Sequence, residues 1–98
     1  MKKLDKRNCY YIPKKLIHAT DVDFSKEIRL YVGRFCHYLD NTHSYLNDRR
    51  IPDLGVVHID SKGRLYFPAK VREHLRINKS TTIDCYISEG KITFMTIV

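Results

Sequence analysis

HIDSKGRLYFPAK, residues 58–70, combines a short apolar strand pattern, a polar turn and a proline within thirteen positions. Asp60 opens the turn, where its carboxylate can accept hydrogen bonds from nearby backbone amides, and Gly63 closes it with easy access to positive φ. A second short strand follows, and Pro68 ends it because proline has no amide hydrogen to donate. Since proline suits the first turn of a helix, residues 69–75 are expected to be helical. The stretch therefore predicts a strand–turn–strand–helix unit.

The residues that follow this unit predict a β-hairpin. Residues 82–88 alternate apolar and polar side chains, Glu89 and Gly90 suit a tight turn, and residues 91–98 return as a strand. With a first strand at 56–59, the second half of the chain is expected to have the element order β-β-α-β-β.

A second, weaker copy of this pattern lies near the N-terminus. When the chain is shifted by 55 positions, residues 1–43 fall on residues 56–98 without a gap, and LDKRNCYYIPKKL lies over IDSKGRLYFPAKV. Seven of the 43 aligned positions are identical, against roughly two or three expected by chance at typical residue frequencies. Asn8 falls on Gly63, and both residue types tolerate positive φ in a turn. The sequence therefore predicts an internal repeat, although two short hairpins of similar composition could also produce the match.

The repeat divides one expected domain, residues 1–98, into three segments. They are a first, degenerate copy at 1–43, a polar connector at 44–54 and a second copy at 55–98. In the first copy, strands are expected at 9–12, 27–32 and 35–39 and a short helix at 14–19.

Length and composition restrict the possible classes of protein. Ninety-eight residues suffice for one small domain, and 43% hydrophobic residues indicate a folded chain. No apolar run approaches the roughly 20 residues that a membrane span needs, and no signal peptide is visible. The three cysteines are scattered and odd in number. They suit reduced thiols in the cytoplasm better than a disulfide framework.

The positive charge is concentrated in two windows of the sequence. The formal net charge is +7: residues 1–15 carry +5, residues 58–76 carry +3, and the rest of the chain sums to −1. Basic domains of this size often bind nucleic acid, because lysine and arginine neutralise phosphates and release counterions. The alternative is a solvated basic face that only keeps a small protein soluble.

The second copy resembles the AbrB/MazE/SpoVT swapped-hairpin family of bacterial DNA-binding domains. Residues 55–77 follow the family pattern D-x-x-G-R-x-x-x-P-x-x-x-R, which runs here from Asp60 to Arg72, and the resemblance continues more weakly to Val98. In that family, two copies interlock their hairpins into one small barrel. Two copies within one chain are similar to the MraZ branch. The resemblance implies a mainly β fold with short helices, a swapped-hairpin β-barrel built from two tandem β-β-α-β-β copies.

The same resemblance implies a transcriptional regulator that contacts double-stranded DNA through basic loops and short helices. Such a protein would act in the bacterial cytoplasm at the nucleoid, without a cofactor or metal, as a pseudo-dimeric monomer or a homodimer. The residues expected to bind DNA are His58, Lys62, Arg64, Lys70, Arg72, Lys6, Arg7, Lys14 and Lys15.

The first copy departs from the family pattern at one of these positions. Asp60 is followed four residues later by Arg64, whereas Asp5 is followed by Cys9, and Arg7 is displaced by two positions. We therefore expect the first copy either to touch DNA differently or to serve mainly as a structural half.

Two other classes of function remain open. An antitoxin of the MazE type would bind a protein toxin, although such antitoxins usually carry a tail beyond the barrel and this sequence ends on the last expected strand. A purely structural oligomerisation module would carry its basic face incidentally. Catalysis is not expected, since we find no nucleophile–base pair, phosphate-binding glycine loop or zinc-ligand spacing. Tyr10, Tyr11 and Tyr66 could stack on unpaired bases, but packing within strands explains them more simply.

Overall fold

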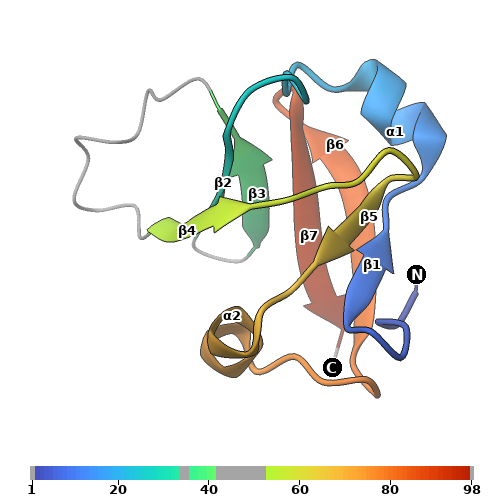
Figure 1. Cartoon of the computed structure of the whole chain (residues 1–98), viewed down its shortest axis with the longest axis vertical. Coiled ribbons are helices and arrows are strands. Elements are labelled where there is room, and N and C mark those ends of the chain that lie inside the picture. Colours follow the sequence, from blue (N-terminus) through green and yellow to red (C-terminus); the bar gives the residue numbers. More distant parts are fainter. Residues whose placement is uncertain (1, 34–35, 42–52, 98) are drawn as a thin grey trace.

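The computed structural model describes residues 2–33, 36–41 and 53–97 of the chain. These residues form strands and two short helices (Figure 1). They are β1 (Cys9–Tyr11), α1 (Lys14–Ala19), β2 (Ile28–Val32), β3 (His37–Asp40), β4 (Asp53–Val57), β5 (Arg64–Tyr66), α2 (Ala69–Leu75), β6 (Thr82–Ser88) and β7 (Lys91–Ile97).

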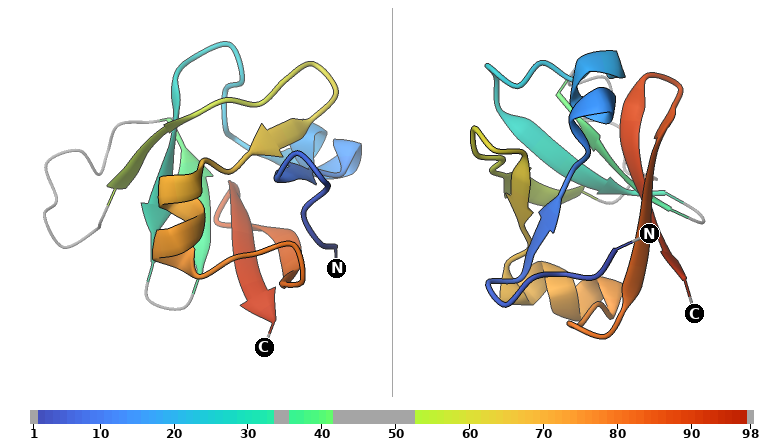
Figure 2. Two further views of the ribbon diagram at one scale, coloured as in Figure 1. Left: turned by 60° about the horizontal axis from the view of Figure 1, so that its bottom comes forward. Right: turned by 90° about the vertical axis from the view of Figure 1, so that its right-hand side faces the viewer.

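The strands form two layers with the hydrophobic core between them. β1 and β5 make a two-stranded antiparallel ribbon, and the other strands make a sheet in the order β4-β2-β3-β7-β6. Figure 2 shows the ribbon set apart from the β6–β7 hairpin, with α1 at one end and α2 at the other. The rings of Tyr10 and Phe67 meet Phe94 of the sheet edge-on, at centroid distances of 5.5 and 5.9 Å. The predicted mainly β fold with short helices is confirmed.

The described strands do not close into one hydrogen-bonded barrel. The sheet ends at β4 on one side and at β6 on the other, and the ribbon is a separate ladder. Isolated bridges join Lys2 to Ile83 and Ile59 to Leu65. The architecture of the described residues is therefore an open sheet covered by a ribbon, where the resemblance implied a closed barrel.

Residues that lie 55 positions apart occupy corresponding places in the ribbon. Cys9 pairs with Tyr66 and Tyr11 pairs with Arg64. Because Arg64 and Tyr66 follow Cys9 and Tyr11 by 55 positions, exchanging the two strands leaves the register unchanged. The ribbon therefore has a local two-fold pseudosymmetry.

The two hairpins of the sheet share a register in the same way. Leu30 pairs with Leu39 in the β2–β3 hairpin. The residues 55 positions later, Cys85 and Phe94, pair in the β6–β7 hairpin. The correspondence therefore extends from the ribbon to the sheet.

Several predicted element bounds agree with the structure, the strands expected at 9–12, 27–32 and 35–39 differ by one or two residues at an end, and one strand is displaced further. The helices at 14–19 and 69–75 and the strand at 82–88 have the predicted bounds. The strand expected at 56–59 instead occupies Asp53–Val57. Within this strand Gly55 adopts a φ of 100°, and the register against β2 shifts, as in a β-bulge. The expected connector at 44–54 therefore overlaps β4 at its last two residues, and the rest of it lies outside the described residues. Over the described ranges, no helix combines the length and apolar character needed to cross a bilayer.

Candidate nucleic-acid interface

Asp60 organises the turn that leads into β5. Its Oδ1 accepts hydrogen bonds from the backbone N–H groups of Lys62 and Arg64, both at 2.9 Å. Gly63 adopts a φ of 81°, and a Cβ at this position would lie 2.9 Å from Cδ1 of Ile17. The turn therefore packs closely against α1, and the prediction that Asp60 forms the turn is confirmed.

Asp5 builds a turn of the same geometry before β1. Its Oδ1 accepts hydrogen bonds from the backbone N–H groups of Arg7 and Cys9, at 2.8 and 2.9 Å. Asn8 takes the place of Gly63 with a φ of 63°. Since Cys9 and Arg64 begin the two antiparallel strands, the two turns lie at opposite ends of the ribbon.

The side chain of Arg64 is held in place by an ion pair within its turn. Its Nε lies 2.5 Å from Oδ2 of Asp60, and 29% of the Arg64 side chain is exposed. The hydrogen bond that Arg64 donates to the Asp60 carboxylate, and after it the interaction with the Tyr11 hydroxyl, raises the pKa of Arg64. Asp60 in turn has a lowered pKa, chiefly because its carboxylate accepts the backbone amide of Arg64. Both groups are therefore charged at neutral pH, and the guanidinium is fixed before any ligand binds.

The first turn presents an uncharged group at the corresponding position. Burial, and after it the nearby Asp5 carboxylate, raises the pKa of the Cys9 thiol. The thiol is therefore protonated at neutral pH. The two turns have the same backbone geometry but differ in charge at the start of their strands.

Residues from both halves of the chain line one recess on the outer face of the ribbon. Cys9, Arg64 and Tyr66 lie on the face opposite to that of the buried Tyr10 and Leu65. The residues that line the recess are Arg7, Cys9, His58, Ile59, Asp60, Arg64 and Tyr66. Three of the predicted DNA-binding residues, Arg7, His58 and Arg64, are therefore brought together.

The other predicted residues do not line this recess. Arg72 is half-buried, and its Nη1 donates a hydrogen bond to the backbone carbonyl of Phe67. Its guanidinium therefore supports the segment between β5 and α2. The remaining predicted residues are exposed in the two turns (Lys6, Lys62), at the start of α1 (Lys14, Lys15) and in α2 (Lys70).

The prediction that the tyrosines pack within strands is right for one residue and wrong for two. Tyr10 is buried, with 2% of its surface exposed, but Tyr11 and Tyr66 are 43% and 48% exposed. Strict alternation along each ribbon strand could have shown this, since Tyr11 and Tyr66 each follow a buried residue. Sequence reasoning also missed Lys79, whose Nζ donates a 3.0 Å hydrogen bond to the carbonyl of Lys6.

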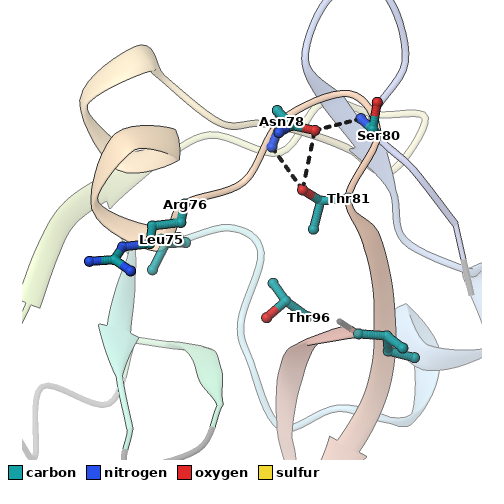
Figure 3. Close-up of a pocket in the computed structure, with 7 residues that line it drawn as sticks. Leu75, Arg76, Asn78, Ser80, Thr81 and Thr96 are labelled. Carbon is teal, nitrogen blue, oxygen red and sulfur yellow. Dashed lines mark hydrogen bonds between the residues drawn. The ribbon is translucent and has the colours of Figure 1, made fainter.

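A second recess lies between α2 and the end of the β6–β7 hairpin (Figure 3). The turn from Asn78 to Thr81 satisfies its own polar groups, because Asn78 Oδ1 accepts from the amide of Ser80 and Thr81 Oγ1 accepts from the amide of Asn78. Arg76 is its charged lining residue, and Figure 3 shows the guanidinium directed away from this turn. Charged groups therefore do not converge here as they do on the ribbon.

Within the ranges that the structure describes, no group of three or more histidine, cysteine or acidic side chains could hold a metal ion. No protein-family model, curated protein or solved structure matches the chain.

Proposed function

We propose that this chain is a DNA-binding regulator that contacts double-stranded DNA through the outer face of the ribbon and its two basic turns. The observation that carries the proposal is the convergence of Arg7, His58 and Arg64 on one recess. Lys6 and Lys62 are exposed in the two turns and extend the positive surface toward both ends of the ribbon. Cations arranged in this way neutralise phosphates and release counterions, which supplies much of the affinity for a duplex.

Arg64 is the residue best placed to contribute specificity. An arginine can direct two donors at the O6 and N7 acceptors of guanine in the major groove. Arg64 loses little side-chain freedom on binding, because its ion pair with Asp60 already orients the guanidinium. Lys62 is exposed in the same turn and has no such brace, so we assign it to phosphate contacts.

We further infer that the chain consists of two copies of one β-β-α-β-β unit in a swapped-hairpin arrangement like that of AbrB-type domains. In support, the segment leading into each unit pairs with the hairpin of the other unit. Val57 of the second half lies opposite Ile28 of β2. Lys2 lies 55 positions before Val57, and Ile83 lies 55 positions after Ile28. The backbones of Lys2 and Ile83 are likewise joined, by reciprocal hydrogen bonds of 2.9 and 2.8 Å.

This interleaving within one chain favours a pseudo-dimeric monomer. The solution mass should then be 11.6 kDa at both low and high salt. A dimer that persists at high salt would contradict this assignment, because it would show that the interleaved unit needs a second chain.

DNA binding can be tested by fluorescence anisotropy with a labelled 20-base-pair duplex over a series of salt concentrations. The affinity should fall steeply with salt, and Arg64→Ala should weaken binding by about 1–3 kcal/mol. Arg76→Gly is the matched control, because it also removes one positive charge, lies outside the ribbon recess, and replaces a residue whose φ of 56° glycine adopts without strain. Binding that does not respond to salt, or an equal loss in the two variants, would contradict the proposed site.

A further inference from the structure

We propose that the outer face of the ribbon also binds unpaired bases of single-stranded nucleic acid, with Tyr11 and Tyr66 as stacking platforms. This inference rests on the proposed nucleic-acid function of the same face and specifies a class of ligand for it. It starts from the exposure of two large aromatic side chains beside cationic groups.

The two tyrosines are exposed for a reason that lies in the ribbon itself. Tyr10 and Leu65 occupy the inward face and are 2% and 0% exposed, so the residues after them must point outward. The part of each tyrosine that stays exposed does not contribute to the stability of the fold, because buried apolar surface is what stabilises it. Their 43% and 48% exposure therefore leaves both rings available to a ligand.

The arrangement of the two rings fits successive bases of one strand. Tyr11 lies opposite Arg64 and Tyr66 lies opposite Cys9, so the tyrosines are diagonal neighbours on one face. Diagonal neighbours in an antiparallel pair are about 7–8 Å apart. Two aromatic rings at such a spacing can each receive one base, and stacking of this kind tolerates any base because every base has a π-face.

Two arginines and a histidine line the recess that Tyr66 also lines. Arg64 lies directly opposite Tyr11 in the ribbon and lines the recess together with Tyr66. Arg7 and His58 line the same recess. Aromatic side chains beside a basic groove are the combination by which proteins hold single strands, with the cations following the backbone and the rings receiving the bases.

Binding to a labelled dT15 strand, a U15 strand and a 15-base-pair duplex tests the inference. Wild-type protein should bind dT15, and comparison with U15 shows whether the strand is preferably DNA or RNA. Tyr11→Ala and Tyr66→Ala should each weaken single-strand binding about 5- to 150-fold, with a smaller effect on the duplex. Tyr11→Phe and Tyr66→Phe keep the π-face and should bind within about two-fold of wild type. Thermal unfolding of the alanine variants controls for folding, and both positions are exposed.

The outcomes separate this inference from the proposed function. Duplex binding without binding to either single strand would overturn the inference and leave the proposed function standing. Alanine variants that bind both single strands as tightly as wild type would also overturn it. If the wild-type protein binds no nucleic acid at all, both proposals fail.

Discussion

Tyr10 lies directly opposite Leu65 at the centre of the ribbon, and the two residues are 55 positions apart in the chain. Tyr38 and Thr93, which are also 55 positions apart, lie opposite each other where β3 meets β7. In the ribbon and in the sheet alike, a residue therefore pairs with the residue 55 positions later. Strands related by a two-fold axis pair in this way. Cys9 and Arg64 therefore occupy equivalent positions in the ribbon and differ only in their side chains.

Cys9→Arg should increase the affinity for duplex DNA. Asp5 already holds the turn as Asp60 does, and the new guanidinium would find a carboxylate at the place where Asp60 braces Arg64. One additional arginine contact should strengthen binding by about 1 kcal/mol and steepen the salt dependence by about one counterion. An anisotropy titration at several salt concentrations measures both quantities.

Cys9→Ser is the control for this substitution, because it changes the same side chain without adding charge. Equal affinities for the two variants would mean that the first half does not reach DNA. Its turn would then serve only to complete the fold.

Arg72→Ala should destabilise the fold as well as weaken DNA binding. The half-buried guanidinium donates to the carbonyl of Phe67, and hydrogen bonds from charged donors are worth about 1.5–3 kcal/mol. Lys70→Ala removes an exposed cation from the same helix and should change the free energy of unfolding by less than about 0.5 kcal/mol. Urea denaturation of both variants measures the difference. Equal stabilities would show that Arg72 is free for another role.

The sequence predicted best what depends on neighbouring residues. Pro13 and Pro68 mark the starts of the two helices, and Asp60 and Gly63 have the local chemistry of a turn, so these features could be located correctly. The offset of 55 positions also relates paired residues of the two hairpins, but the sequence alone did not predict these registers.

Features that depend on distant contacts could not be predicted in the same way. The antiparallel pairing of β1 with β5 joins strands about 55 residues apart, and local propensity does not specify such partners. The convergence of Arg7 and His58 on Arg64 follows from that pairing. The supporting role of Arg72 was missed because its acceptor is a backbone carbonyl, which leaves no mark in the sequence.

Gly63→Ala should destabilise the chain more than Asn8→Ala, although the two residues occupy corresponding turns. An alanine at a φ of 81° costs about 1–2 kcal/mol, and its Cβ would also lie 2.9 Å from Cδ1 of Ile17. Asn8 already carries a Cβ at a φ of 63°, so its replacement adds no atom. Asn8→Gly should be close to neutral.

Thermal unfolding of these three variants tests the role of the close contact with α1. If Gly63→Ala and Asn8→Ala cost the same, backbone strain alone would account for both. Ile17→Val, introduced into the Gly63→Ala variant, removes the Cδ1 that the new Cβ would approach. If the close contact contributes to the cost, the double variant should recover part of the lost stability, and if backbone strain alone is responsible it should recover none.

Stability should decrease at acid pH because of the two turn carboxylates. Backbone hydrogen bonds from Cys9 and Arg64, the largest lowering influences, hold the pKa of Asp5 and of Asp60 below the ordinary value of 3.8. The unfolded chain therefore takes up these protons at a higher pH than the folded chain does. The stabilisation is complete above pH values of about 4–5 and is lost as the pH falls through the lower folded pKa.

Asp60→Asn should flatten this acid dependence more than Asp5→Asn, because Asp60 also accepts a side-chain hydrogen bond from Arg64. An asparagine can still accept the amides of the turn but cannot pair with the guanidinium as an anion. Midpoints of thermal unfolding between pH 2 and 7 measure the effect, with Glu73→Gln, an exposed position in α2, as the control. If wild type, Asp60→Asn and Glu73→Gln lose stability in parallel on acidification, the turn carboxylates do not govern the acid stability of the chain.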